Sequence, residues 1–294
     1  MRSVIISIIF LLLASVKTAA QKLDEVRWQV DNLISSFPGV VGVSMVSDLG
    51  DTIHINENHH FPLMSVVKFH QALAVYNKCK EHEIMLDKRI RVRRRDMMEK
   101  TWSPMRDKNP RGGNYTIEEL LKLSLVESDN NACNIFSDKF VSMKEVNDFV
   151  HSVGIMDCCI SVSERHMATE TNACYGNWST PKTATELLEW FLDNQASYKF
   201  VWDTMKGCKT GTNRLPRYLE DVIIVHKTGT GPTLPDGKIM AVNDAACIIL
   251  PNNHHYSIAV FIENAACDLE KCKDLIANIS RLCFDHMIKH LKSF

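Results

Sequence analysis

Near the start of the chain, hydrophobic residues first recur at the spacing of a helix and then in short runs typical of strands. Between residues 23 and 37, apolar side chains recur at the spacing of an amphipathic helix. The run Val40–Val46 is rich in β-branched residues, and Thr52–Asn56 repeats that character after a short polar interval. We therefore expect a helix, then a β-hairpin, and a second helix over Ser65–Glu81, where the period changes again.

The middle of the chain is dominated by signals of helix initiation. Thr116-x-x-Glu119 and Ser142-x-x-Glu145 both match the capping box, in which a hydroxyl and a carboxylate satisfy free N–H groups of the first turn. Thr180-Pro181 adds another start, because proline is well tolerated at the first helical position. We expect this part of the chain to be all helical.

Strand patterns return in the last third of the chain. Val222–Val225, Ala241–Leu250 and Tyr256–Glu263 are typical of strands, and the polar residues 251–253 supply a turn. Asp268–Leu291 then has the pattern of a long closing helix. The prediction is an α/β fold (an α+β sandwich). Its antiparallel sheet is built from both chain ends and flanked by helices, with an all-helical insert.

This organisation predicts three parts of the chain. Residues 1–20 are expected to be a signal peptide, residues 21–57 and 208–294 an α/β domain, and residues 58–207 a helical domain. An active site at the seam between two such units is a common arrangement.

The first twenty residues have the character of an export signal. Arg2 precedes an apolar run from Val4 to Val16, and small residues follow as far as Ala20. The run is shorter than the ~20 residues of a membrane-spanning helix. We expect cleavage before Gln21, a periplasmic or secreted mature chain, and no membrane attachment after cleavage. An uncleaved N-terminal anchor is the alternative.

Composition and charge narrow the choice of partners. The 294 residues carry a formal net charge of −1, with 45% apolar and 23% charged residues, which is ordinary globular composition. A chain without excess charge gives no reason to expect nucleic acid or an anionic membrane as partner. We expect a monomer that acts on a small molecule.

Neither the cysteines nor the histidines form a recognisable ligand pattern. The ten cysteines include no C-x-x-C, and several lie in apolar contexts, so we expect mostly free thiols and at most one or two disulfides. His59-His60 and His254-His255 are adjacent pairs and lack the i, i+4 spacing of helical ligands. We expect neither a metal nor a cofactor.

Ser65-Val66-Val67-Lys68 is the first candidate for chemistry. On a helix, residues at i and i+3 share a face, so the Lys68 amine can contact the Ser65 hydroxyl and take its proton. Ser65 is expected to open its helix, where a free backbone N–H suits an oxyanion. Taken alone, the motif is also found in ordinary helix starts.

Two further short motifs follow along the chain. Ser128-Asp129-Asn130 offers a hydroxyl for proton relay and an amide for a substrate, although it also suits a plain helix cap at Asp129. Lys227-Thr228-Gly229 offers a positive charge, a hydroxyl and close backbone approach, although it also suits a plain strand end. The order and spacing of all three motifs together are far more specific than each motif alone.

At these motifs the chain resembles the penicillin-recognising serine enzymes. Within that group it is similar to class A β-lactamases, and most to the cephalosporinases of anaerobic bacteria. The resemblance covers nearly the whole mature chain and implies the β-lactamase/penicillin-binding-protein-like fold. The matching stretches are residues 64–73, 102–104, 128–133, 175–178 and 226–231.

The resemblance also implies a role for each motif residue. Ser65 corresponds to the nucleophile, Lys68 to its proton acceptor and Ser128 to the proton donor for the lactam nitrogen. Asn130 would bind the substrate amide, and Lys227 and Thr228 would bind the substrate carboxylate, with Arg214 as a second carboxylate anchor. The backbone N–H groups of Ser65 and Thr230 would bind the oxyanion. Gly229 would let the substrate approach the backbone closely, and Trp102 would form an aromatic wall. A plain surface or core role for Trp102 and a solvated loop position for Arg214 are the alternatives.

The resemblance further implies an acidic residue that drives deacylation. Class A enzymes place it about three dozen residues after the Ser of Ser-Asp-Asn. Glu164 lies 36 residues after Ser128 and Glu170 lies 42 after it, so Glu164 is the expected acid. Four residues after the acid the family usually has a side chain that helps to hold the hydrolytic water. Ala168 stands there, which puts the placement of that water in doubt.

The resulting hypothesis is hydrolysis of β-lactams through an acyl-enzyme on Ser65, with water activated by Glu164 and with cephalosporins as preferred substrates. One alternative is a penicillin-binding DD-peptidase, which normally lacks the loop that carries the acid. The other is a non-hydrolytic β-lactam-binding protein, an idea that the missing side chain at Ala168 keeps open.

Overall fold

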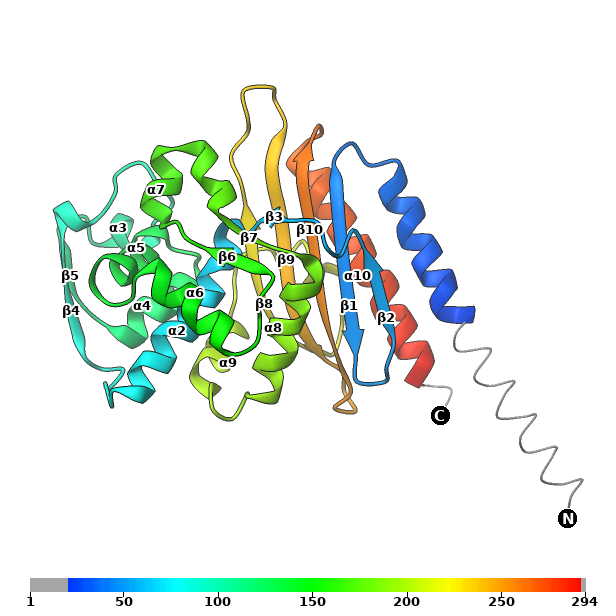
Figure 1. Ribbon diagram of the computed structural model, residues 1–294, viewed down its shortest axis with the longest axis horizontal. Helices are drawn as coiled ribbons and strands as arrows, with labels where there is room; N and C mark the ends of the chain where they lie inside the picture. Colours follow the sequence, from blue (N-terminus) through cyan, green and yellow to red (C-terminus); the bar gives the residue numbers. More distant parts are fainter. Residues whose placement is uncertain (1–20, 292–294) are drawn as a thin grey trace, which may run out of the picture.

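A five-stranded antiparallel sheet forms the centre of the computed structural model, which describes residues 21–291. The strand order is β2-β1-β10-β9-β8, so the first strands of the chain pair with the last ones (Figure 1). The sheet predicted from both chain ends is confirmed. The signal peptide predicted for residues 1–20 lies outside the described residues. The strands are β1 (Val40–Ser47), β2 (Thr52–Ile55), β8 (Ile223–Thr230), β9 (Ile239–Ile249) and β10 (His255–Ala265).

Helices cover both faces of this sheet. The helix of residues 21–35 and α10 (Leu269–Leu291) pack on one face, and α8 (Pro181–Asp193) packs on the other. Successive residues of β10 therefore belong to different cores: Val260 faces the core that includes α10, and Phe261 faces the core that includes α8. This alternation follows from the period of two along a strand.

The part of the chain between β2 and β8 is mainly helical. Thr116 and Ser142 form the capping boxes expected from the sequence, and Thr180 caps α8 with Pro181 in its first turn. The remaining α-helices of this part are α2 (Val67–Glu81), α3 (Pro104–Lys108), α4 (Ile117–Val126), α5 (Asn130–Lys139), α6 (Met143–Ser152), α7 (Glu164–Thr169) and α9 (Lys199–Met205).

Short strands also occur in this part, which had been expected to be all helical. One small sheet has the order β3-β7-β6 and another pairs β4 with β5. Strands of two to five residues are too short to show a period of two in sequence. α8 belongs to the same stretch and packs on the large sheet, so the division of the chain at residue 207 stays a prediction. The short strands are β3 (Phe61–Pro62), β4 (Arg89–Arg93), β5 (Gly112–Thr116), β6 (Cys158–Ile160) and β7 (Asn177–Ser179).

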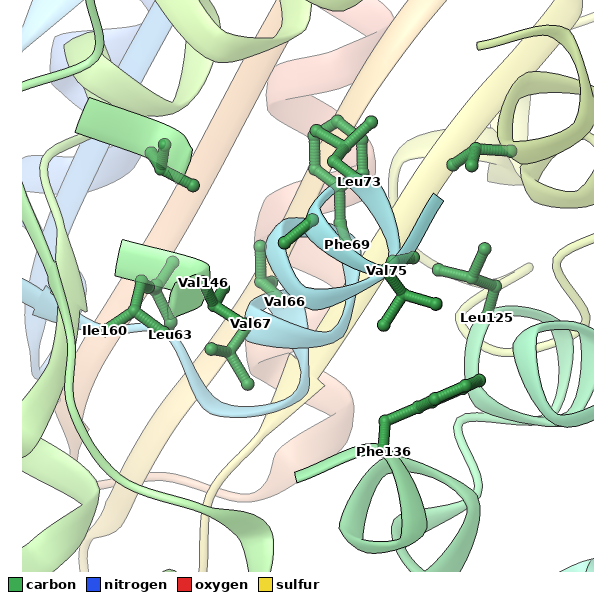
Figure 2. Close-up of a cluster of buried hydrophobic side chains, with 14 of the residues drawn as sticks. Leu63, Val66, Val67, Phe69, Leu73, Val75, Leu125, Phe136, Val146 and Ile160 are labelled. Carbon is green, nitrogen blue, oxygen red and sulfur yellow. The ribbon is translucent and has the colours of Figure 1, made fainter. Parts of the chain in front are cut away.

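Helix α2 lies at the centre of the helical part. Every residue from Val67 to Val75 is buried, and α2 contacts α4, α5, α6 and α9. Figure 2 shows Phe69 and Leu73 side by side on one face of this helix and Val75 on another face. Full burial of one such side chain contributes about 1.5–3 kcal/mol, so this helix is a firm support for residues at its N-terminal end.

All ten cysteines lie in the described residues and all are free thiols. Cys267 and Cys272 come closest to pairing, with their sulfurs 3.7 Å apart and not bonded. The expectation of mostly free thiols is confirmed.

Candidate active site

Ser65 lies on a single 3-10 turn, η1 (Met64–Val66), which leads into α2. The sequence predicted that an α-helix opens at Ser65, and one tighter turn precedes it instead. Strand β8 passes very close to this turn. A Cβ atom added to Gly229 would lie 2.5 Å from the carbonyl oxygen of Leu63 and 3.3 Å from the backbone nitrogen of Ser65. Only glycine lets the strand run beside the nucleophile at this distance.

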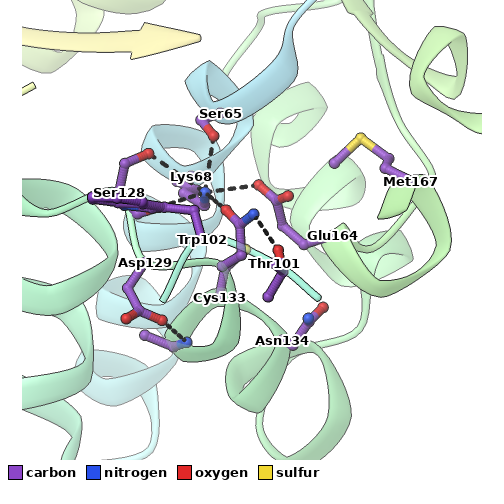
Figure 3. A network of polar contacts seen from close by, with 12 residues as sticks. Ser65, Lys68, Thr101, Trp102, Ser128, Asp129, Cys133, Asn134, Glu164 and Met167 are labelled. Carbon is purple, nitrogen blue, oxygen red and sulfur yellow. Dashed lines mark hydrogen bonds and ion pairs between the residues drawn. The ribbon is translucent and has the colours of Figure 1, made fainter. Parts of the chain in front are cut away.

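The buried side chain of Lys68 meets acceptors from several elements. Its Nζ atom lies 2.9 Å from Ser65 Oγ, 3.0 Å from the Ser128 carbonyl oxygen, 2.5 Å from Asn130 Oδ1 and 2.8 Å from Glu164 Oε1 (Figure 3). An ammonium has three N–H donors, so the serine and asparagine oxygens compete for its protons, while Glu164 Oε1 forms an ion pair with it and no hydrogen bond. Such a group is well suited to pass a proton between its neighbours.

Ser128 lies between two lysines. Its Oγ atom accepts a hydrogen bond from Lys227 Nζ at 2.9 Å and lies 3.4 Å from Lys68 Nζ. Lys227 is fully buried in β8, and its Nζ also contacts the Thr228 carbonyl oxygen. Burial, together with the nearby charge of Lys68, lowers the pKa of Lys227 to about 8. Protons can therefore move along a short path from one lysine to the other through a hydroxyl.

The two candidate carboxylates lie in different environments. Glu164 begins α7, where the Ser163 side chain caps the helix, and its side chain is buried against Lys68. Glu170 is exposed and lies 3.1 Å from His166. The structure therefore brings Glu164, and not Glu170, to the nucleophile and its lysine. Ala168 is exposed on α7.

A cleft of about 250 Å³ opens in front of Ser65. Trp102 forms part of its wall and is 61% exposed, and its indole N–H donates to the Glu127 carbonyl oxygen at 2.8 Å. An exposed tryptophan held by one hydrogen bond can present its flat face to a ligand. The residues that line the cleft are Ser65, Trp102, Ser128, Asn130, Thr210, Gly211, Arg214, Thr228 and Thr230.

Arg214 is only 5% exposed, so it is not a solvated loop arginine. Its guanidinium donates to the carbonyl oxygens of Gly229 at 2.9 Å and Asn243 at 2.7 Å, and to Thr230 Oγ1 at 2.5 Å. The side chain therefore braces the end of β8 and places a positive charge beside the Thr230 hydroxyl. This end of the cleft favours an anionic group.

Comparison with known proteins identifies the family. A sequence model of the "Beta-lactamase enzyme family" matches residues 25–287. A "Beta-lactamase" from Bacteroides uniformis is 36% identical over 275 residues, which cover 91% of this chain and 93% of that protein. Another from Phocaeicola vulgatus is 32% identical and covers 88% and 84%. The chain belongs to the β-lactamase family.

Solved structures narrow the class of this β-lactamase. A class A β-lactamase from Bacteroides cellulosilyticus DSM 14838 has a TM-score of 0.85 with 36% identity, covering 92% of this chain and 98% of that one. TLA-3 extended-spectrum β-lactamase has a TM-score of 0.88 with 32% identity, covering 90% and 99%. Both the fold and the class A assignment from sequence are confirmed. The chain is a serine hydrolase that opens β-lactams, an activity that confers antibiotic resistance.

Two threonines of this β-lactamase were missed in the sequence analysis. Thr101 Oγ1 accepts a hydrogen bond from Asn130 Nδ2 at 2.7 Å, so the second end of the amide is also held. Thr210 and Thr228 share a hydrogen bond of 2.7 Å between their hydroxyls. Thr101 directly precedes the predicted Trp102, and this position was the only feature of the sequence that could have indicated it. Thr210 lies in Lys209-Thr210-Gly211, which repeats the Lys-Thr-Gly pattern of residues 227–229, and that repeat could have marked it.

A buried ion pair behind Lys227 was also missed. His226 Nδ1 lies 3.0 Å from Asp244 Oδ1, and both residues are buried. Burial alone would lower the pKa of His226, but the Asp244 carboxylate outweighs it and raises that pKa to about 10. The pair ties β8 to β9 directly behind the substrate-facing end of the strand.

One group in the described residues could hold a metal ion, and it lies outside the catalytic cleft. It consists of Asp51, His286 and His290. The adjacent pairs His59-His60 and His254-His255 do not belong to this group. His286 and His290 have the i, i+4 spacing of helical ligands, and that signal could have found them.

Within residues 21–291, no helix combines the length and apolar character that a bilayer crossing requires.

Proposed function

We propose that this enzyme hydrolyses β-lactams through an ester on Ser65 and that Glu164 drives the second half of the reaction. The observation that carries the proposal is the position of Lys68 Nζ, 2.9 Å from Ser65 Oγ and 2.8 Å from Glu164 Oε1. One buried amine thus joins the nucleophile to the carboxylate. An adjacent base is what a serine hydroxyl needs to become nucleophilic.

In the acylation step, Ser65 Oγ bonds to the lactam carbonyl carbon while its proton passes to Lys68. For this step Lys68 must be neutral, so that its amine can accept the proton. The carbon–nitrogen bond then breaks, and Ser128 protonates the leaving nitrogen. Ser128 regains its proton from the lysines on either side of it. The net change is transfer of the Ser65 proton to the lactam nitrogen.

In the deacylation step, water attacks the ester carbon while Glu164 takes one of its protons. The bond to Ser65 Oγ breaks, and the oxygen regains a proton through Lys68. Ala168 is exposed and has no hydrogen-bonding side chain, so it does not help to hold that water. The water must depend on Glu164 and the groups beside it.

Substrate binding is proposed to use both sides of the cleft. Thr228 and Arg214, which line the cleft, and Lys227, which is fully buried next to Thr228 in β8, would bind the substrate carboxylate. Asn130 would hold the side-chain amide, and Trp102 would cover one face. The backbone N–H groups of Ser65 and Thr230 would form the oxyanion hole, and Gly229 keeps β8 close enough for this.

Cephalosporins are proposed as the preferred substrates. The support is the resemblance to cephalosporinases and the likeness to TLA-3, which is described as an extended-spectrum enzyme. The test is to compare kcat/KM for one cephalosporin and one penicillin with the purified chain of residues 21–294. A clear preference for penicillins would overturn this part of the proposal.

The mature enzyme is proposed to act as a monomer in the periplasm or outside the cell, released from the membrane by signal cleavage. Mass spectrometry of the exported protein would locate the cleavage site, and a chain that retains residues 1–20 would contradict the proposed cleavage.

The alternatives of a DD-peptidase and a non-hydrolytic binder are tested by turnover of a chromogenic cephalosporin. Sustained turnover excludes the binder, and the absence of peptide cleavage excludes the peptidase.

A further inference from the structure

Two histidines near the end of α10 point at one carboxylate from the opposite end of the chain. His286 and His290 are four residues apart on the helix and therefore lie on the same face, one turn apart. Asp51 directly precedes β2. The turn before it is closed by hydrogen bonds between Ser47 and Asp51, from Ser47 N to Asp51 O at 3.0 Å and from Asp51 N to Ser47 Oγ at 3.1 Å. A rigid hairpin turn thus faces the last turns of a long helix (Figure 1).

The three side chains converge on one point. His286 Nε2 lies 2.8 Å and His290 Nδ1 lies 2.7 Å from the same oxygen, Asp51 Oδ2. The three potential ligand atoms all lie within 4.8 Å of one another. His286 and Asp51 are buried, and His290 is half-buried at the edge of the group.

The kind and geometry of these ligands fit a zinc ion. Zinc takes imidazole nitrogens at about 2.0–2.1 Å and carboxylate oxygens at about 2.0–2.2 Å in a tetrahedral arrangement, which places neighbouring ligand atoms about 3.3 Å apart. To bind the ion, the two nitrogen–oxygen distances would open by about 0.5 Å, and the two imidazole nitrogens, within 4.8 Å of each other, would have to lie about 3.3 Å apart. Calcium and magnesium prefer oxygen ligands alone and fit less well.

We propose that Asp51, His286 and His290 bind one Zn²⁺ ion, with water in the fourth position on the half-buried side of His290. The ion would connect the β1–β2 turn to the last turns of α10 and so join the two ends of the chain. It would have a structural role, because none of its ligands lines the cleft around Ser65. An ion that binds only the folded chain stabilises it, so the melting temperature should rise with zinc concentration.

The test uses the full mature chain after treatment with a chelator and removal of that chelator. Zinc chloride is titrated by calorimetry at about pH 7.5, where most imidazoles are neutral. The melting temperature is followed in parallel. The proposal expects one tightly bound equivalent and an upward shift of the melting temperature. No saturable binding, or binding without a shift, would overturn it and leave the cluster as a hydrogen-bonded network.

Three variants assign the binding to these residues. His290→Gln and Asp51→Asn should each weaken zinc binding by about 100-fold or more, since even partners of ligands cost 10–100-fold when removed. His290 is half-buried, which makes its variant the safer one for folding. The control is the double variant His254→Gln/His255→Gln, which removes another histidine pair and should bind as the unaltered chain does. Loss of binding in this control alone would overturn the proposal.

Turnover of a chromogenic cephalosporin shows that each variant is folded. The unaltered chain and all three variants should have the same kcat at 25 °C with and without zinc. A zinc-dependent kcat that persists in His290→Gln would place the ion elsewhere and contradict the proposed site. This readout is independent of the roles proposed for Ser65 and Glu164, because it compares each protein only with itself.

Discussion

Glu164 Oε1 lies 2.8 Å from Lys68 Nζ, although the first residue begins α7 and the second lies in the first turn of α2. Both side chains are buried, so little water screens the interaction between them. The same lysine nitrogen is 2.9 Å from Ser65 Oγ. The nucleophile and the carboxylate therefore share one proton carrier, and a change at either end should affect a different half of the reaction.

Glu164→Gln should still acylate and then stop. The amide cannot accept a proton from water, so the ester on Ser65 should persist, visible as a mass increase of the intact protein after mixing with a cephalosporin. The matched control is Glu170→Gln, which changes an exposed carboxylate that pairs with His166. It should keep steady-state turnover within a few fold. A trapped adduct in the control and not in Glu164→Gln would reverse the assignment.

Ser65→Ala should abolish covalent labelling by a penicillin and nearly all turnover. The loss of a nucleophile that works as a unit with its base typically costs on the order of 10⁶ in kcat. Peptide mapping after incubation with penicillin gives the readout. An adduct on another residue of the variant would show that Ser65 is not the nucleophile.

Hydrolysis should not require a metal ion. Ser65 and Ser128 line the cleft, Lys68 and Glu164 lie next to them, and the candidate metal ligands lie elsewhere. Dialysis against EDTA should leave kcat/KM for a cephalosporin unchanged at 25 °C, even if the melting temperature falls. Activity that disappears with EDTA and returns with zinc would contradict this prediction.

Local sequence signals predicted most of the fold. The capping boxes at Thr116 and Ser142, the proline start of α8 and the terminal strands all depend on residues close together in the chain. The small sheets were missed because strands as short as Phe61–Pro62 carry no periodic pattern. The 3-10 turn at Ser65 was missed for a related reason, since one turn does not change the helical period of α2.

The site required more than local signals. Spacing alone explains why Ser65 and Lys68 touch, but the approach of Glu164 depends on tertiary packing, and only the family resemblance suggested it. Arg214 could not be placed from sequence, because its burial depends on the pairing of β8 with β9, which brings together the Gly229 and Asn243 carbonyl oxygens that its guanidinium contacts. Asp51 and His286 come from opposite ends of the chain, and no sequence pattern connects them.

The pH profile should have an alkaline limit set by Lys227. This lysine is proposed to bind the substrate carboxylate as a cation, and its pKa is lowered to about 8. Above that pH it loses its proton and its charge, so kcat/KM, which reports the free enzyme, should fall as pH rises past about 8. Lys227→Arg keeps a charge at all accessible pH values. It should lose activity at pH 7 through altered geometry, but its kcat/KM should stay flat to higher pH. The measurement is kcat/KM for one cephalosporin from pH 6 to 10 with both proteins. If the activity of Lys227→Arg falls at the same pH, the limit belongs to another group, such as the Cys208 thiol. Burial raises the pKa of this thiol, but its hydrogen bond with His226 outweighs burial and lowers that pKa to about 7.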